Sequence, residues 1–363
     1  MNDFEEYTQA GEPGQREKAN AWATAIGLQQ VDGLKPSQHL LDTARRHIEG
    51  EITQEEARRI VDEYYETKLG HDIPEDAEEA DKVSARIVAI VNAPGFRLSP
   101  EYYLGLHKQI FDGVFPHAGE IRDVELTKRE WVLNGDTVEY ELSCMIEKSL
   151  AYDFDQERKF KYKGLTEDAF VEHFAAFISG IWQIHPFREG NTRTTALFAI
   201  KYLRSLKYDV ANDLFAQKSW YFRNALVRAN YTNRKLDVEK TQLPLEEFFK
   251  VLIFGHDLEL HNRFLKIGQE YGSPVASAIQ DMHHDGVNRS DDGVNDGVKL
   301  TATEDRAVMA ILKDSHITAT LLAKTLGVKQ RQAERVIATL KVKAGLKRRG
   351  ADKNGEWYFS KGE

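Results

Sequence analysis

The sequence has little cysteine and no long apolar run. Cys144 is the only cysteine among 363 residues, so no disulfide forms within the chain and no cysteine-based zinc site is available. No stretch approaches the roughly 18 apolar residues that a membrane-spanning helix needs, and the acidic start is unlike a secretory signal peptide. We therefore expect a cytoplasmic protein that does not enter a membrane.

The chain also has no overall basic charge, because its net charge is −9. The charge is unevenly distributed. Residues 301–363 contain 13 Lys and Arg against seven Asp and Glu, which gives +6 and leaves −15 for residues 1–300. An acidic body with a basic tail indicates that only the tail meets a polyanion.

Helical periodicity dominates the first 268 residues and predicts a mainly α fold. Thr53, with a glutamate three residues later, begins a capping box. Ser99 followed by Pro100 predicts a helix N-cap with proline at the first helical position. Thr166 caps a further helix with a buried aromatic face.

One stretch departs from this period. Val124 to Tyr140 alternates around Asn134-Gly135, a pair typical of a tight β-hairpin turn. A lone hairpin is not stable by itself, so we expect it to pack on the helices as a flap.

Composition divides the chain into four parts. Residues 269–300 are rich in Asp, Gly and Asn and lack a hydrophobic period, which is typical of a linker. The final part shows three helical segments and a short hairpin, the winged helix-turn-helix arrangement. The predicted parts are a small helical N-terminal module (1–75), a helical core with the hairpin flap (76–268), the linker (269–300) and the winged helix-turn-helix (301–363).

The predicted recognition helix of the tail is basic. Lys329, Arg331 and Arg335 lie on it, and further cations lead into the wing. This placement fits phosphate contacts in duplex DNA. A protein-interaction winged helix with a basic face remains an alternative.

The most informative segment runs from residue 185 to 196 and reads HPFREGNTRTTA. A polar, glycine-containing loop lies there between two apolar helices. The backbone amides from Gly190 to Arg193 would be the unpaired donors of a new helix N-terminus, which is a natural phosphate site. Asn191 and Arg193 add side-chain donors for the same anion.

The same loop carries an acid and a base. Glu189 could hold a Mg²⁺ ion that bridges phosphates. His185 is the one side chain of the loop whose ordinary pKa is near neutrality, so it is a candidate general base. This combination suits transfer of a phosphoryl-type group.

The segment resembles the signature of the Fic family, H-x-F-x-[DE]-G-N-[GK]-R-x-x-R. The matching positions are His185, Phe187, Glu189, Gly190, Asn191 and Arg193. The resemblance extends over about residues 80–265. It implies a Fic-type helical core that moves AMP from ATP to a Ser, Thr or Tyr hydroxyl of a protein, either itself or another; some relatives transfer other phosphate-containing groups.

The resemblance also implies roles for the motif residues. His185 would deprotonate the target hydroxyl, and Glu189 would ligate Mg²⁺. Gly190, Asn191 and Thr192 would hold the α- and β-phosphates of ATP. Arg193 would contact the outer phosphates.

Two further regions follow from the resemblance. Val124, Leu126 and Thr127 would lie in the flap that docks a target segment by strand addition. Tyr221 and Asn230 fall where Fic proteins place the nucleobase, although aromatic residues at helical spacing also suit a core. The sequence leaves a homodimer open.

The segment departs from the signature at two positions. Thr192 replaces a glycine, which adds a β-branched side chain where backbone approaches phosphate. Ala196 replaces the second arginine of the signature. Two alternatives to AMP transfer therefore stay open: a non-catalytic nucleotide-binding regulator with a DNA-binding tail, and a transferase that uses another nucleotide donor.

The N-terminal segment resembles the small separate Fic antitoxins. Many Fic enzymes carry an inhibitory motif, [ST]-x-x-x-E-[GN], whose glutamate pairs with the second arginine. Here Leu28, Asp32 and Gly33 occupy the corresponding places in degenerate form. We expect the module to dock as a helical lid without that ion pair; the alternative is that Asp32-Gly33 is merely a turn that ends a helix.

Overall fold

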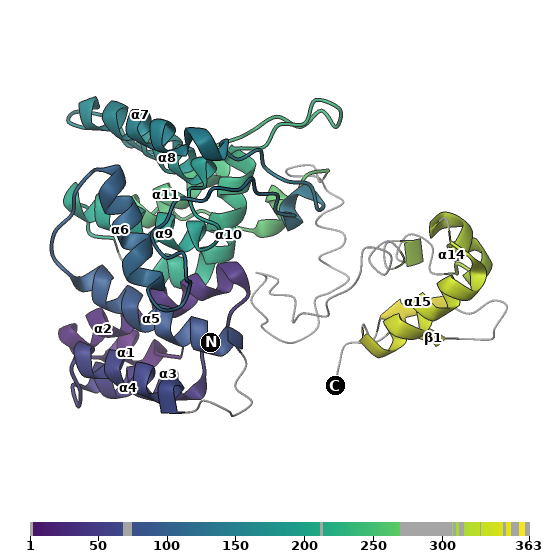
Figure 1. The fold of residues 1–363 in the computed structure, drawn as a ribbon, viewed down its shortest axis with the longest axis horizontal. Helices are drawn as coiled ribbons and strands as arrows, with labels where there is room; N and C mark the ends of the chain where they lie inside the picture. The colour runs from purple at the N-terminus through teal and green to yellow at the C-terminus, as the bar shows by residue number, and fades with distance from the viewer. Residues whose placement is uncertain are drawn as a thin grey trace. The chain divides into compact units, whose positions relative to one another are not determined.

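The computed structural model describes residues 3–67, 75–210, 213–268, 307, 310–311, 316–326, 328–343, 346–349 and 356–359. The chain divides into two compact units, residues 1–292 and 293–363, and each is described by itself (Figure 1). Almost all regular structure is helical, which confirms the predicted fold class. The predicted linker, 269–300, lies outside the described residues.

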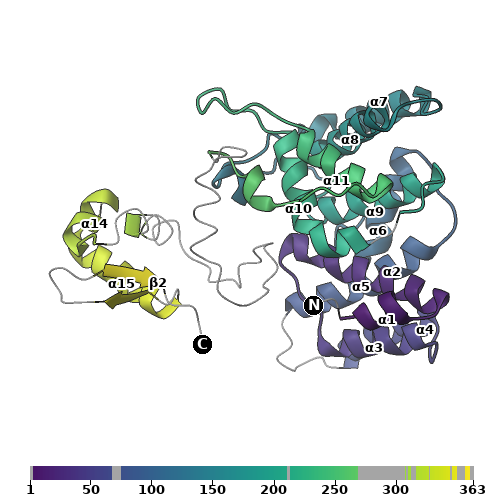
Figure 2. The same ribbon diagram turned by 180° about the vertical axis from the view of Figure 1, so that it is seen from behind.

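The first unit begins with helices that lie together at one end, drawn in purple (Figures 1 and 2). Their bounds are α1 (Glu5–Ala10), α2 (Pro13–Gln29), the 3₁₀ turn η1 (Gln30–Asp32), α3 (Gln38–Glu49) and α4 (Gln54–Thr67). Gly33 ends η1 with φ of 74°, a left-handed conformation that glycine adopts without strain. Helix α2 packs against helices from later in the chain as well as against its neighbours.

The remaining helices of the unit complete its core. Their bounds are α5 (Glu75–Asn92), α6 (Pro100–Phe111), η2 (Trp131–Leu133), η3 (Ser143–Met145), α7 (Ile146–Lys159), α8 (Glu167–Ile184), α9 (Asn191–Ser205), α10 (Asp213–Ala229), α11 (Leu243–Phe254) and η4 (Asn262–Leu265). Helices α7 and α8 lie at the end opposite the purple helices (Figure 1). Helix α9 packs on α5, α6 and α8.

The helix starts expected from the sequence are present. The Ser99 hydroxyl accepts a hydrogen bond from the Tyr102 amide at 3.2 Å, and Pro100 is the first residue of α6. The Thr166 hydroxyl accepts from the Ala169 amide at 3.3 Å at the start of α8. These caps occupy amides that have no acceptor within their helices.

The N-terminal helices and the later helices share one hydrophobic core. Fully buried side chains from both, such as Trp22, Leu28 and Phe222, belong to the same cluster. Helix α2 lies so close to α10 that a Cβ atom on Gly27 would be 2.4 Å from the Ala216 Cα. The segment that resembles an antitoxin is therefore an integral part of the first unit.

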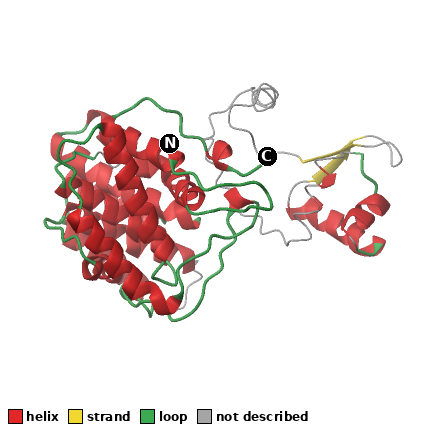
Figure 3. Cartoon of the chain, turned by 90° about the horizontal axis from the view of Figure 1, so that it is seen from above, coloured by secondary structure: helices red, strands yellow, loops and turns green. Residues whose placement is uncertain are grey.

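The strands that we expected in the hairpin flap are absent from the described residues. The described residues 121–142 form no strand, and the yellow strands in Figure 3 belong to the second unit. The turn itself is as expected, because Asn134 and Gly135 both have positive φ, 55° and 90°. Beside the turn, the Glu130 amide donates to the Asp136 carbonyl and the Gly135 amide donates to the Glu130 carbonyl, both at 2.9 Å, but these described residues form no regular strand pair. The Ile267 amide also donates to the Val132 carbonyl of η2 at 2.9 Å.

The described residues of the second unit include two helices followed by a pair of strands. Helix α14 (Ala319–Leu326) and helix α15 (Gln330–Lys343) pack together, and β1 (Leu346–Arg349) pairs antiparallel with β2 (Glu356–Phe359). The Trp357 indole donates to the Ile317 carbonyl at 3.0 Å and anchors the strand pair to the helices.

Within the described part of the chain, the helices are too short or too polar to cross a lipid bilayer.

Candidate active site

His185 lies at the end of α8, where the helix stops and the motif loop begins. It is the C-cap residue and has φ of 49° and ψ of 59°, a left-handed conformation that costs energy for a residue with a side chain. Such strain persists where the surroundings hold the residue firmly, and it clusters at functional sites. The conformation turns the chain sharply between α8 and α9.

The imidazole of His185 has one nitrogen engaged and one available. Its Nδ1 lies 3.2 Å from the Trp182 carbonyl oxygen, which only accepts hydrogen bonds, so the proton is on Nδ1. Its Nε2 is buried and has no hydrogen-bond partner among the described residues. The remaining lone pair on Nε2 is that of a base.

The surroundings keep this imidazole neutral. Burial lowers the pKa of His185 well below its ordinary value, and the positive charge of Lys128 lowers it further. The Tyr140 ring stacks on the imidazole with 4.0 Å between ring centroids. His185 is only 2% exposed, so the surrounding residues have to open before a target hydroxyl reaches Nε2.

Arg122 holds the chain at His185 and at the next residue, Pro186. Its buried guanidinium donates to the His185 carbonyl at 2.8 Å and also to the carbonyls of Val124 and Glu141. Its backbone amide donates to the Pro186 carbonyl at 2.8 Å. These contacts connect the motif loop to the segment that was expected to form the flap.

Asn191 closes the motif loop from within. Its side chain accepts from the Phe187 amide at 3.0 Å and donates to the Phe187 carbonyl at 2.7 Å. Both polar atoms of the side chain are thus engaged inside the loop, whereas we expected them to contribute a donor for an anion. Phe187 itself is fully buried and anchors the loop in the core.

The start of α9 provides the backbone donors of the site. Gly190 is the N-cap residue with φ of 72°, and its carbonyl accepts from the Thr194 amide at 3.0 Å. The amides of residues 191–193 precede that first bond, so they have no acceptor within the helix. Together with the helix dipole they form an arrangement suited to an anion.

Arg193 is buried and faces the N-terminal helices. Its guanidinium is 2.8 Å from the Asp32 carboxylate, 2.8 Å from the Gln29 side-chain oxygen and 2.7 Å from the Glu79 carboxylate. It also lies over the Phe111 ring, 4.8 Å from the ring centroid. All of these partners come from α2, η1, α5 and α6.

A second arginine connects Asp32 to the segment after Arg122. Arg223 pairs with the buried Glu130 at 3.1 Å and with Asp32 at 3.3 Å. Desolvation raises the pKa of Asp32, but the charges of Arg193, Arg223 and Lys128 outweigh it and bring that pKa below its ordinary value. Asp32 is therefore a charged link between the two arginines.

Residues 97–203 match the family model described as the Fic/DOC family. This chain contains a Fic/DOC domain.

The Fic/DOC match extends to curated relatives. The probable protein adenylyltransferase y4lH of Sinorhizobium fredii is 29% identical over 129 residues, which make up 35% of this chain and 63% of the relative. Protein adenylyltransferase VbhT of Bartonella schoenbuchensis is 28% identical over 153 residues, 37% of this chain and 30% of the relative. The chain thus spans less than two thirds of either relative.

Two solved structures are similar at low identity. The BepC protein of Bartonella tribocorum with bound AMPPNP is 20% identical, with 51% of this chain and 90% of that chain covered and a TM-score of 0.39. The N-terminal FIC domain of Bep8 from Bartonella sp. 1-1C is 18% identical, with 51% and 88% covered and a TM-score of 0.39.

Within the Fic/DOC domain, the departures from the signature are both buried. Thr192 is 5% exposed, and its hydroxyl accepts a hydrogen bond from the Trp182 indole at 3.0 Å. Its side chain therefore packs against α8. Ala196 is fully buried, so the place of the second arginine is filled by core packing.

Asp32 has two arginine partners that the sequence did not indicate. Asp32 pairs with Arg193, the first arginine of the signature, and with Arg223. The sequence argument considered only position 196, where alanine stands. Leu28 is buried. Gly33 ends η1, so Asp32-Gly33 is also the helix-ending turn that we considered as an alternative.

The other predicted site residues have these positions. Tyr221 is buried in α10 beside the Phe248 ring, and Asn230 donates to the carbonyls of Ser179 and Leu226. The flap residues lie in the loop after Arg122, and one of them, Val124, is 43% exposed.

Glu189 is exposed at the edge of the motif loop. In the described part of the chain, no cluster of three or more His, Cys, Asp or Glu side chains could hold a metal ion. One carboxylate is enough for Mg²⁺ when substrate phosphates and water supply the other ligands. Glu189 therefore fits a Mg²⁺ ion that arrives with a nucleotide.

Sequence reasoning missed several residues around the motif loop. Tyr140 and Glu130 belong to the segment read as a hairpin, and their contacts with His185 and Arg223 carry no local signal. One hint was present in the sequence: Glu130 stands directly before the apolar pair Trp131-Val132. An acid that is buried with such residues requires a positively charged or hydrogen-bonding partner.

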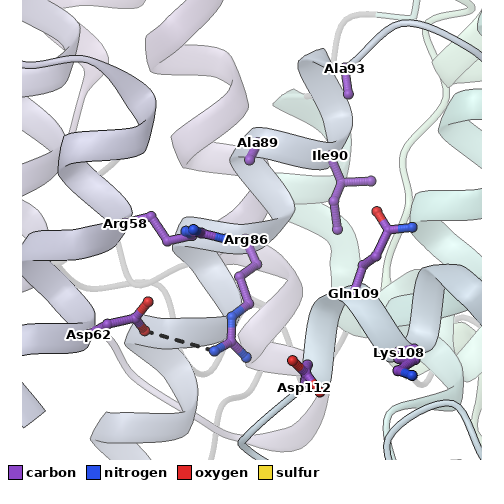
Figure 4. A pocket seen from close by; sticks show the side chains of 9 residues that line it. All are labelled: Arg58, Asp62, Arg86, Ala89, Ile90, Ala93, Lys108, Gln109 and Asp112. Carbon is purple, nitrogen blue, oxygen red and sulfur yellow. Dashed lines mark ion pairs between the residues drawn. The ribbon is translucent and has the colours of Figure 1, made fainter. Parts of the chain in front are cut away.

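A polar cavity of about 620 Å³ lies elsewhere in the first unit (Figure 4). Residues of α4, α5 and the end of α6 line it, and an Arg86–Asp62 pair with 3.8 Å between nitrogen and oxygen crosses it. None of its lining residues belongs to the motif loop. We assign no part of the reaction to it.

Proposed function

We propose that the chain is a protein adenylyltransferase that moves AMP from ATP to a Ser, Thr or Tyr hydroxyl, on itself or on another protein. The observation that carries this proposal is the tautomer of His185, whose buried Nε2 keeps a free lone pair in the same motif loop that leads into α9. The names of the curated relatives, both protein adenylyltransferases, support it.

In the proposed reaction, Nε2 of His185 takes the proton of the target hydroxyl. The hydroxyl oxygen then forms a bond to the α-phosphorus of ATP, and the bond between that phosphorus and the bridging oxygen to the β-phosphate breaks. Pyrophosphate leaves with the electron pair. The amides of residues 190–193 balance the negative charge of the phosphates.

Glu189 would hold Mg²⁺ together with the phosphates. A bound Mg²⁺ ion would neutralise charge on the phosphate oxygens. The exposed position of Glu189 suits a metal that binds with the nucleotide.

The test uses labelled ATP and Mg²⁺ with the full chain. Wild-type protein should transfer label to itself or to protein from a cell extract, and His185→Ala should lower the rate by about 1000-fold without weakening nucleotide binding. Equal labelling of both proteins removes His185 from its role. Nucleotide binding without any transfer by wild type supports the regulator, and transfer from another nucleoside triphosphate supports a different donor.

Ala196 is the specific observation that favours those two alternatives. A methyl group in the core replaces the guanidinium that the family places on the terminal phosphate. Arg193 is the remaining arginine of the signature, and it faces the N-terminal helices. Contact with the outer phosphates therefore requires Arg193 to exchange partners.

The N-terminal helices would act as a brake through this exchange. Asp32, Gln29 and Glu79 occupy the guanidinium of Arg193, so a nucleotide has to compete with them for it. The brake would act on the first arginine of the signature through a carboxylate at the end of η1. Because helices between residues 3 and 67 share the core of the unit, point variants test it better than truncation.

The second unit would bind duplex DNA as a winged helix-turn-helix. Its described residues form two helices followed by a strand pair, as in a winged helix-turn-helix. Lys329 directly precedes α15, Arg331 and Arg335 lie in α15, and all three are exposed. Cations on this helix fit phosphate contacts. Binding of the full chain to duplex DNA should weaken steeply with salt, and changing these three residues to Gln should reduce the slope.

The matched control changes three exposed lysines of the first unit, Lys148, Lys161 and Lys163, to Gln. It should leave DNA binding unchanged. Binding without salt dependence, or equal loss in both triple variants, removes the DNA-binding proposal.

A further inference from the structure

His107 of α6 contacts the motif loop and is fully buried. Its Nε2 lies 3.1 Å from the Glu189 carbonyl oxygen, and its Nδ1 accepts from the Gly119 amide at 2.8 Å. A carbonyl only accepts and an amide only donates, so the ring carries its proton on Nε2. Both ring nitrogens are therefore engaged in one fixed tautomer.

Stacking fixes the plane of the same ring. The centroid of His107 is 3.7 Å from that of Phe187, and the two rings are inclined by 10°. Phe111 lies on α6 one turn further along, with 4.7 Å between its centroid and that of His107. His107 thus contacts the motif loop at two residues, Phe187 through its ring face and Glu189 through a hydrogen bond.

The bond to Glu189 determines how one peptide group is oriented. A trans peptide is planar, and its carbonyl and amide point in opposite directions. Since the Glu189 carbonyl is held by His107, the Gly190 amide points away from His107. Gly190 lies close to α6 as well, since a Cβ atom added at this position would be 2.4 Å from the Phe111 ring.

We propose that His107 is a positioning residue of the site: it orients the Glu189–Gly190 peptide so that the Gly190 amide faces the nucleotide phosphates. This inference rests on the proposed adenylyl transfer. His107 acts through the motif loop and does not touch the reacting atoms. Gly119, its second partner, belongs to the segment that continues to Arg122, so the same ring connects that segment to the loop.

Two amide variants separate the two hydrogen bonds. In His107→Gln, the side-chain amide reaches as far as Nε2 and can donate to the Glu189 carbonyl. In His107→Asn, the side-chain oxygen can accept from the Gly119 amide, but its nitrogen does not reach Glu189. The two variants remove the same ring and differ in the bond that they keep.

The first readout is the amide resonances of the ligand-free chain in heteronuclear NMR spectra. The Gly190 amide should shift in His107→Asn and stay near its wild-type position in His107→Gln, and the Gly119 amide should show the reverse. The second readout is the affinity for ATP with Mg²⁺, which should fall about tenfold in His107→Asn and about threefold or less in His107→Gln.

Each result has a distinct meaning. If the two variants behave alike at Gly190 and bind ATP equally, His107 does not position the peptide. If wild-type protein binds no ATP, the proposed function fails, while the NMR comparison still decides whether His107 orients the peptide. If His107→Asn does not fold, His107→Gln must still keep the Gly190 resonance, and loss of that resonance overturns the proposal.

Discussion

The motif loop and the two arginines beside it are held by different kinds of interaction. The loop is held by buried hydrogen bonds to backbone groups: Arg122 donates to the His185 carbonyl, and Asn191 bonds both the amide and the carbonyl of Phe187. Arg193 and Arg223 are held mainly by carboxylates. The two carboxylates that hold Arg193 reach solvent in part, since the side chains of Asp32 and Glu79 are 30% and 21% exposed, whereas Glu130 beside Arg223 is buried.

This difference indicates which side chains of the site can change their hydrogen-bond or ion-pair partners when a nucleotide binds. The Arg122 guanidinium is buried and already donates to the carbonyls of three residues, His185, Val124 and Glu141, so nucleotide binding does not require it to change partners. An incoming phosphate does compete with the Asp32 carboxylate for the guanidinium of Arg193, since both are anions that pair with arginine. The base and its loop are therefore prearranged, and the arginine contacts are the part that nucleotide binding has to change.

The largest expected effect comes from crowding the motif loop. Gly190→Ala places a methyl group at a φ of 72° and 2.4 Å from the Phe111 ring, so the start of α9 has to move. Displacement of about 1 Å costs roughly 100-fold in rate, and we expect a loss of AMP transfer of that size. The measurement is the initial rate of label transfer.

Gly164→Ala is the matched control for that variant. Gly164 also has positive φ, 85°, but a Cβ atom there would meet open space. It should transfer AMP at close to the wild-type rate. A Gly190→Ala protein as active as Gly164→Ala would show that the loop is less rigid than its hydrogen bonds indicate.

The next effect concerns the arginines. Asp32→Asn removes the charge that pairs with both Arg193 and Arg223. A charge-assisted hydrogen bond contributes roughly 1.5–3 kcal/mol, so release of Arg193 should raise the transfer rate or the ATP affinity about tenfold. The measurement is both quantities at limiting ATP.

The control for Asp32→Asn is Asp155→Asn. Asp155 pairs with Lys159 at 2.5 Å on the exposed face of α7, so the same substitution removes an ion pair far from the motif in sequence. It should change neither quantity. A fall in activity in Asp32→Asn would mean that Asp32 supports the site and does not restrain it.

Local signals explain how much of the fold was predictable. The caps at Ser99 and Thr166 depend on residues within one helical turn, and both were found in the sequence. The Asn134-Gly135 turn was found for the same reason. The strands expected around it were wrong, and the segment also bonds at Val132 and Glu141 to Ile267 and Gln183, which are distant in sequence.

The same limit applies to the candidate site. The motif itself is contiguous, so His185 and its loop were recognised from the sequence. The pairing of Asp32 with Arg193 joins residues that the sequence separates widely, and no local pattern reports it. The role of Arg122 was missed because its partners are backbone carbonyls, which leave no mark on the identity of the residues that carry them.

The smallest expected effect is in the pH dependence of the rate. Burial and the charge of Lys128 lower the pKa of His185 below its ordinary value of 6.5, so Nε2 remains unprotonated as the pH falls to that value. The pKa of Asp32 is lowered as well, so its ion pairs also persist over this range. Between pH 8 and pH 6.5 the transfer rate should therefore change by less than about twofold. Protonation of His185 reduces the rate only at lower pH.

A decline in rate that begins near pH 7 would mean that water reaches His185 during turnover and that Tyr140 is no longer stacked on it. The conformation of the loop during the reaction would then differ from the conformation described here.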